Sequence, residues 1–143
     1  NFKDLLPFFW KWFETGFQKI KRLHVLGGEP FYQKDFDQLL EYIDKYPNPN
    51  CELNIVSNLM VHPEKFKLYI DQMKTLVTKR KIKRLDITCS IDCWGPQQEY
   101  VRWGLNLDQW KQNFELLLKN KWLYININQT ISPLTIKTTS DAE

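Results

Sequence analysis

A pair of glycines followed by a glutamate is the part of the sequence that most directly suggests chemistry. An apolar run at residues 23–26 ends at Gly27 and Gly28, and Glu29 and Pro30 follow. Glycine has no Cβ, so the backbone at these two positions can approach a small ligand closely. If the run is a strand, Glu29 lies at its carboxyl end, where open α/β folds place their ligands.

Short polar side chains follow two later apolar runs in the same way. Ser57 and Asn58 come at the end of the run at residues 52–57, and Ser90 and Asp92 flank Ile91 at the end of the run at residues 84–91. Each pair has a structural alternative. Ser57 and Asn58 also fit a helix-capping turn, and Ser90 and Asp92 also fit an Asx-type turn that ends a strand.

Three aromatic or imidazole side chains near these positions have two possible roles. His24 comes just before the glycines, and it either faces a ligand cavity or is a hydrogen-bonded histidine of the core. Trp94 and Trp103 fall in a long segment at residues 92–106, where they either cover a substrate or pack in the core. We see no Ser/His/Asp set, zinc-ligand spacing or P-loop in the sequence.

Helices that alternate with four short apolar runs must position these residues. Apolar residues spaced three and four apart predict four helices, one starting near Pro7, one from Asp35 as N-cap to residue 45, one from Pro63, and one over residues 107–120. The strands are expected at residues 22–26, 52–57, 84–91 and 122–129, with loops at residues 47–50 and 92–106. The inward-facing residues of the helices are Leu6, Phe9, Phe13, Phe17 and Ile20, then Phe36, Leu39, Leu40 and Ile43, then Phe66, Ile70, Met73 and Val77, and last Trp110, Phe114, Leu117 and Leu118.

The alternation within the strands indicates a sheet with one polar face. Successive side chains of a strand point to opposite faces. Helices between the strands argue for parallel strands, and we expect them to cover the apolar face and the polar face to line the inside of a partial barrel. The alternative is an antiparallel sheet with one face in water. The alternating residues are Leu85, Ile87, Cys89 and Ile91 against Asp86, Thr88, Ser90 and Asp92, and Leu123, Ile125 and Ile127 against Tyr124, Asn126 and Asn128.

The length and composition are those of one globular domain spanning residues 1–143. The chain is 43% hydrophobic and 26% charged, with a formal net charge of +3. The basic residues at 79–81 are expected at a solvated helix end, and nucleic-acid binding is the less favoured reading. No apolar stretch approaches the roughly 20 residues that span a bilayer. The 3 cysteines are an odd, sparse set, which favours a reduced, cytoplasmic location.

The glycine, serine and arginine motifs together resemble the radical S-adenosylmethionine (radical SAM) superfamily, closest to twitch-type members of the kind found in phage and marine genomes. Residues 27–30 look like the superfamily's second-strand motif, residues 56–58 like its third-strand position, and residues 90–92 like its fourth-strand Ser-x-Asp. Residues 99–104, followed by Trp110, Asn113 and Phe114, look like its R-x-G…F segment. The resemblance covers nearly the whole chain.

The resemblance implies a six-stranded (β/α)6 partial TIM barrel, of which this chain supplies strands two to five. It assigns Gly27, Gly28 and Glu29 to the amine of S-adenosylmethionine (SAM), and it places Ser57 and Asn58 near the methionyl group. Ser90 and Asp92 correspond to ribose contacts. Arg102 corresponds to a ligand of the SAM carboxylate, since a guanidinium pairs with carboxylates bidentately; a surface ion pair with Glu99 is the alternative.

The resemblance also implies a 4Fe-4S cluster held by three cysteines in a C-x₃-C-x₂-C loop after strand one. One electron then cleaves SAM to a 5′-deoxyadenosyl radical, which takes a hydrogen atom from a substrate that the sequence does not identify. This chain lacks the three-cysteine motif. Cys89 and Cys93 have a similar spacing, but four residues of extended chain span about 13 Å, so we expect Cys89 to be a buried thiol instead. The cluster ligands are expected before Asn1, in a longer protein of which this chain is an internal fragment.

Two other functions stay open at this point. One is a non-catalytic binding or scaffold module with the same half-barrel, and the other is a barrel enzyme that acts on phosphate or sugar substrates. A sheet cut on both sides exposes two edges, so self-association through them is also expected.

Overall fold

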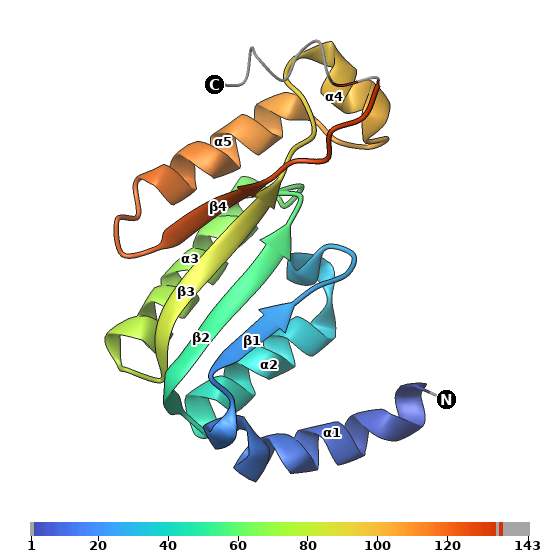
Figure 1. Cartoon of the computed structure of the whole chain (residues 1–143). Helices are drawn as coiled ribbons and strands as arrows, with labels where there is room; N and C mark the ends of the chain where they lie inside the picture. The colour runs from blue at the N-terminus through green and yellow to red at the C-terminus, as the bar shows by residue number, and fades with distance from the viewer. Residues whose placement is uncertain (1, 134, 136–143) are drawn as a thin grey trace.

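The computed structural model of the protein describes residues 2–133 and residue 135, and it is an α/β fold built on one parallel sheet (Figure 1). The four strands follow each other in the order β1-β2-β3-β4, and every neighbouring pair is parallel. Of the described strands, β1 and β4 therefore form the two edges. The strands are β1 (Arg22–Val25), β2 (Asn48–Ser57), β3 (Ile82–Ser90) and β4 (Tyr124–Asn128).

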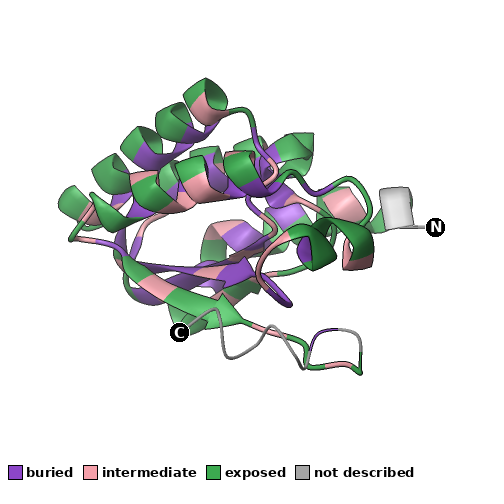
Figure 2. Cartoon of the chain, turned by 90° about the horizontal axis from the view of Figure 1, so that it is seen from above, coloured by how far each residue is buried: buried purple, intermediate pink, exposed green. Residues whose placement is uncertain are grey.

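Helices alternate with the strands along the chain and gather on one face of the sheet. Figures 1 and 2 show α2, α3 and α5 on this face, and no helix of the described residues lies across the other face. The α-helices are α1 (Phe2–Gly16), α2 (Lys34–Lys45), α3 (Pro63–Thr78), α4 (Pro96–Val101) and α5 (Leu107–Leu118), with short 3-10 helices η1 (Phe17–Lys19) and η2 (Pro30–Tyr32).

The two faces of the sheet differ as the alternation predicts. Leu53 pairs with Leu85 in the register of β2 and β3, and both side chains are fully buried under the helices. The next pair, Asn54 and Asp86, points to the face that no described helix covers. Cys89 follows the register of Leu85 and is fully buried, as expected. The parallel order also contradicts the antiparallel alternative.

The helix and strand limits differ from the expected ones at several places, most of them by one or two residues. Helix α1 begins at Phe2 and contains Pro7 in its interior, although a proline there removes one intrahelical hydrogen bond and crowds the preceding turn. Strand β2 begins at Asn48, where a loop was expected. Its register shifts between Asn48 and Glu52, and such irregularities are where a proline is tolerated in a sheet. Helix α2 begins at Lys34 and has Gln33 as its N-cap, whereas Asp35 was expected to be the N-cap.

The segment at residues 92–106 is not only a loop, because it contains the short helix α4. Two helix residues expected to face inward do not do so: Phe9 of α1 is 40% exposed, and Leu118, at the end of α5, is 57% exposed. The other inward residues of α5 agree with the expectation, since Trp110 and Leu117 are buried and Phe114 packs against the core.

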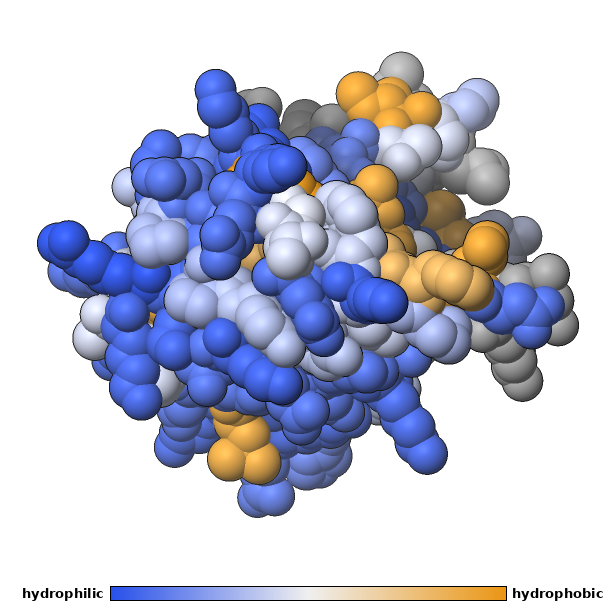
Figure 3. Space-filling view, turned by 90° about the horizontal axis from the view of Figure 1, so that it is seen from below, coloured by the Kyte–Doolittle hydropathy of each residue, from blue (hydrophilic) through white to orange (hydrophobic). Residues whose placement is uncertain are grey.

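The first helix packs its aromatic residues on the rest of the core but also leaves several in solvent. Phe13 and Phe17 are fully buried and stacked with ring centroids 4.4 Å apart, and Trp10 lies 4.7 Å from the ring of Tyr42 in α2. In the space-filling view of Figure 3, hydrophobic residues gather on the side where α1 lies, while the surrounding surface is hydrophilic. The exposed hydrophobic residues of α1 are Leu5, Phe8, Phe9 and Trp12.

No helix in the described part of the chain is both long enough and apolar enough to cross a membrane.

Candidate functional site

The Glu29 side chain, just after β1, links the carboxyl ends of β1 and β2 through hydrogen bonds. The Ser57 hydroxyl donates to its two carboxylate oxygens, at 2.9 Å and 3.0 Å, and the Asn58 backbone N–H donates to Oε2 at 2.9 Å. The chain between β1 and α2 therefore turns back across the end of β2. Three of the predicted site residues, from two separate motifs, are in direct contact.

The environment of Glu29 shifts the pKa of its carboxyl group. Burial raises the pKa of this carboxyl above its ordinary value, and the hydrogen bonds from Ser57, Asn58 and Phe31 only partly oppose that effect. A carboxylate offers about four acceptor positions on its two oxygens, so it can accept a further donor. A cationic donor such as an ammonium group is the partner that a partly buried carboxylate favours most.

The two glycines before Glu29 adopt backbone conformations that suit glycine. Gly27 has φ 94° and Gly28 has φ 57°, both in the left-handed region that other L-residues rarely enter. A Cβ built on Gly27 meets nothing within 4 Å, so the backbone borders open space there. The Gln33 side chain steadies the turn by donating to the Gly27 carbonyl at 3.3 Å.

Ser57 and Asn58 make a local turn but not the helix-capping turn that was the alternative for them, because α3 begins at Pro63 with His62 as its N-cap. The Leu59 backbone N–H donates to the Ser57 hydroxyl oxygen at 2.9 Å, and the Met60 backbone N–H donates to Asn58 Oδ1 at 2.8 Å. The same Ser57 hydroxyl accepts from the turn and donates to Glu29.

Asp92 and Arg102 form a second cluster at the same edge of the sheet. Arg102 Nε donates to Asp92 Oδ2 at 2.5 Å, and Arg102 Nη2 donates to Oδ1 at 3.0 Å. The Thr130 backbone N–H, beyond the end of β4, donates to Oδ1 at 3.1 Å. Burial by itself raises the pKa of Asp92, but the hydrogen bonds and charge of Arg102, with the bonds from Thr130, bring it below its ordinary value.

Neither residue makes the structural contact that was its alternative. Arg102 pairs with Asp92 and not with Glu99, whose carboxylate accepts from the Leu107 backbone N–H at the start of α5. Asp92 does not make an Asx-type turn, since its carboxylate bonds to Arg102 and Thr130. Ser90, one residue before Ile91, is buried on the polar face of β3, and its carbonyl accepts from Trp110 Nε1 at 3.2 Å.

Gln98 is a residue of this site that the sequence did not single out. Its side chain is fully buried, and Oε1 accepts from the backbone N–H groups of Asp92 and Cys93 at 2.9 Å and 2.8 Å. It therefore fixes the chain just after β3. No sequence signal distinguishes it from Gln97, because the segment was expected to be a loop without a buried side.

A small pocket connects the two clusters. It has a volume of about 310 Å³ and is lined by Asn58 from the first cluster and Arg102 from the second, with Met60, Trp103, Gly104 and Leu105. Trp103 is 99% exposed, so it is not a core residue. Trp94 is half-buried and contacts Trp110 edge to face, which agrees with a packing role.

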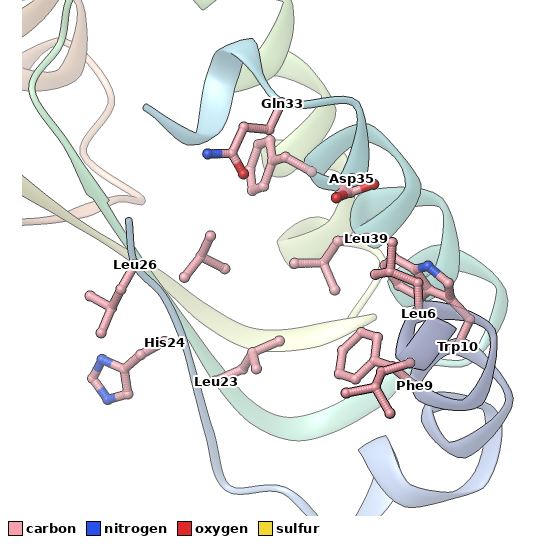
Figure 4. A pocket seen from close by; sticks show the side chains of 12 residues that line it. Leu6, Phe9, Trp10, Leu23, His24, Leu26, Gln33, Asp35 and Leu39 are labelled. Atoms are coloured by element: carbon pink, nitrogen blue, oxygen red, sulfur yellow. The ribbon is translucent and has the colours of Figure 1, made fainter. Parts of the chain in front are cut away.

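A larger cavity than this pocket lies elsewhere, beside the outer edge of β1. It has a volume of about 510 Å³ and lies between α1, β1 and α2. Figure 4 shows that Leu23 points toward Leu6 and Phe9 of α1, while the His24 ring lies on the opposite side of the strand. His24 is among the residues that line this cavity, but none of the residues assigned to SAM is.

The cysteines do not form a metal site. Cys51, Cys89 and Cys93 are free and buried, and burial raises the pKa of the Cys51 and Cys89 thiols to about 11 and about 12. Within residues 2–133 and residue 135, no group of three or more His, Cys, Asp or Glu side chains could hold a metal ion.

Comparisons with protein-family models, curated proteins and solved structures gave no match. The function must therefore be argued from the residues themselves.

Proposed function

We propose that this chain contributes the SAM-binding wall of a radical SAM enzyme, as strands two to five of a (β/α)6 partial barrel. The observation that carries the proposal is the contact of Glu29 with Ser57 and Asn58. These residues belong to two motifs that lie far apart in the sequence, and both were assigned to the same end of SAM. Cytoplasmic location follows from the same proposal.

The residues around Glu29 fit the amine end of SAM. The partly buried carboxylate has acceptor capacity left beside Ser57 and Asn58, and the open space at Gly27 gives a ligand access to the backbone. In this proposal Glu29 orients the amine, and Ser57 keeps the carboxylate in place.

The second cluster supports the same proposal through the pocket at Arg102. Asp92 engages Nε and Nη2 of the guanidinium, which leaves Nη1 for a ligand carboxylate on the pocket side. Asp92, just after β3, and Ser90, at the end of that strand, offer oxygen atoms for the hydroxyls of a ribose. Arg102 and Asp92 then act as one preorganised unit, because each fixes the side-chain conformation of the other.

The described residues do not fit the 4Fe-4S cluster, since they offer no ligand set for a metal. When bound, such a cluster supplies the electron that cleaves SAM. Under this proposal its ligands lie outside the described residues, and we derive no step that depends on it.

The test is the production of 5′-deoxyadenosine by the complete gene product after anaerobic reconstitution with iron and sulfide and addition of dithionite and SAM. We expect product from the natural sequence, and a loss of at least about tenfold in SAM affinity with Glu29→Gln, since one charged hydrogen bond contributes about 1.5–3 kcal/mol. The matched control is Glu64→Gln in the exposed first turn of α3. An intact reconstituted cluster without 5′-deoxyadenosine would contradict the proposal.

A non-catalytic binding module is the second candidate, and one observation favours it. The apolar cavity beside β1 and the exposed hydrophobic residues of α1 form one continuous surface. Surfaces of this kind serve protein contacts. The binding module predicts that Glu29→Gln leaves the function of the whole protein unchanged.

A further inference from the structure

Trp103 lines a pocket with its side chain almost entirely in solvent. It is 99% exposed, and it borders the pocket of about 310 Å³ together with Arg102. Trp94, in the same segment, contacts the Trp110 ring edge to face. Within residues 2–133 and residue 135, Trp103 has no comparable ring contact and no side-chain hydrogen bond. An exposed indole beside a pocket is surface that a ligand can cover.

A tight turn fixes the position of Trp103. The Leu105 backbone N–H donates to the Arg102 carbonyl at 3.0 Å, so Trp103 is the second residue of a β-turn. Gly104, the third residue, has φ 84°, and a type II turn requires a positive φ at that position. The turn is anchored at both ends, because Arg102 is bound by Asp92 and Leu105 is buried in the core. The backbone therefore presents the indole at a defined place beside the pocket.

The pocket connects Trp103 with the groups assigned to the amino-acid end of SAM. Asn58 lines it, and the Asn58 backbone N–H donates to Glu29 Oε2 at 2.9 Å, so the pocket adjoins the carboxylate assigned to the amine. Arg102 also lines it and has Nη1 left for the carboxylate of SAM. The amine and the carboxylate share a carbon atom of SAM, and the short methionyl chain joins that carbon to the sulfonium. Because the Cα atoms of Arg102 and Trp103 are about 3.8 Å apart, the sulfonium is the next group of SAM within reach of the indole.

The charges of the two clusters suit a ligand with an excess of positive charge. Glu29 and Asp92 are carboxylates and Arg102 is a guanidinium, so negative charge is in excess when all three are ionised. SAM carries an ammonium, a sulfonium and a carboxylate, so positive charge is in excess on the ligand. Asp92 engages Arg102 through two hydrogen bonds, which reduces the repulsion between the guanidinium and a second cation. The face of an indole is the aromatic surface that attracts a cation most strongly.

We infer that the Trp103 indole covers the sulfonium of bound SAM and gives this site a preference for SAM over S-adenosylhomocysteine, the uncharged thioether. The inference rests on the proposed function and deepens it, because it names a specificity-determining residue of the same site. Tyr100 is the matched aromatic residue of this segment. It is 81% exposed on α4, but it does not line the pocket.

The first experiment compares the affinities of these two ligands. Equilibrium dialysis uses the complete gene product, reconstituted anaerobically with iron and sulfide and left unreduced, so that SAM binds without being cleaved. We expect Trp103→Leu to weaken the binding of SAM about tenfold, as for a desolvated cation–π contact, and that of S-adenosylhomocysteine by less than about twofold. Trp103→Phe should keep most of the preference, because it retains an aromatic face. Tyr100→Leu is the control and should leave both affinities unchanged.

Two results of this experiment would overturn the inference. An equal loss of affinity for both ligands in Trp103→Leu would mean that the side chain provides apolar contact and no attraction to the charge. Unchanged affinities for both ligands in the same variant would mean that the indole does not contact the ligand.

The second experiment separates the charge of the sulfonium from its methyl group. Sinefungin carries a protonated amine in place of the methylsulfonium group. We expect Trp103→Leu to weaken the binding of sinefungin about as much as that of SAM, about tenfold. A loss restricted to SAM would mean that the indole contacts the methyl group and not the charge, and the inference would be wrong.

The outcomes for Trp103 and for the proposed function can be distinguished. A preference for SAM that depends on Trp103, without formation of 5′-deoxyadenosine, would overturn the radical chemistry alone. Formation of 5′-deoxyadenosine with the same preference in Trp103→Leu as in the natural sequence would overturn the role of Trp103 alone. Absence of SAM binding by the natural sequence would overturn both.

Discussion

Glu29 and Ser57 are held together although 28 residues separate them in the sequence, with the Ser57 hydroxyl 2.9 Å from Oε1 and 3.0 Å from Oε2 of the carboxylate. The same hydroxyl accepts from the Leu59 N–H. Ser57 is therefore the link between the glycine turn after β1 and the turn after β2. Its buried position makes the loss of this link costly.

Replacing Ser57 with alanine tests this link. We expect Ser57→Ala to lower the free energy of unfolding by about 1–3 kcal/mol, because it removes one hydrogen bond from the partly buried Glu29 carboxylate, which keeps that from the Asn58 N–H, and leaves the Leu59 N–H without a partner. It also raises the pKa of Glu29 further, since the Ser57 hydrogen bond favours the ionised form. Urea unfolding gives the first value and ¹³C NMR of the glutamate carboxyls gives the second. Thr78→Ala, at the exposed end of α3, is the control, and an unchanged Glu29 titration would contradict the prediction.

The Asp92–Arg102 pair predicts a pH dependence of stability. The pKa of Asp92 in the folded protein is lower than its ordinary value, which is about 3.9. Its stabilisation is therefore complete above that value and is lost as the pH falls through the folded pKa. We expect Asp92→Asn to be less stable than the natural sequence at neutral pH and to lose less stability on acidification.

Urea unfolding from about pH 2.5 to about pH 7 measures both effects, across the range where carboxyl groups titrate. The matched control is Asp71→Asn on the exposed side of α3, which should follow the natural sequence throughout. If the free energies of unfolding of Asp92→Asn and of the natural sequence changed in parallel with pH, the ion pair would not shift the titration of Asp92.

The parts of the fold that the sequence predicts well are those with a regular period. In β3, Leu85 and Ile87 are fully buried and Asp86 points to the opposite face, as the alternation indicates. The order and parallel pairing of all four strands also follow from the alternation of helices and strands. These features depend on local patterns that a short window of sequence contains.

The parts that the sequence does not predict depend on contacts between distant residues. The Asn48 side chain donates to the Phe17 and Ile20 carbonyls at 2.7 Å and 2.8 Å, and this anchors the start of β2 in a segment whose prolines favour a loop. For the site, the motifs identify Glu29, Ser57, Asp92 and Arg102 as polar groups at strand ends. They do not predict that these residues pair with one another, because pairing depends on the register of the sheet.

Gln98 provides a third prediction, about the loop after β3. Gln98→Ala removes the acceptor for the backbone N–H groups of Asp92 and Cys93, which are buried with it. We expect a loss of about 2–4 kcal/mol in the free energy of unfolding, and faster hydrogen exchange at these two amides. Its neighbour Gln97 is exposed on the same helix, so Gln97→Ala is the matched control. Equal exchange at Asp92 in the two variants would contradict the role of Gln98.

The exposed side of α1 leads to the last prediction, which concerns self-association. Phe8 is 73% exposed beside Leu5 and Trp12, and the unpaired outer edge of β1 lies along the adjoining cavity. Both features favour contact between copies of the chain, because exposed hydrophobic area and free strand edges are sites of association. We expect the mass measured by light scattering to rise with protein concentration, and Phe8→Lys to reduce that rise. Leu68→Lys is the control, since Leu68 is 70% exposed on α3, away from this surface. An equal reduction by both variants would mean that added charge, and not the α1 surface, is responsible.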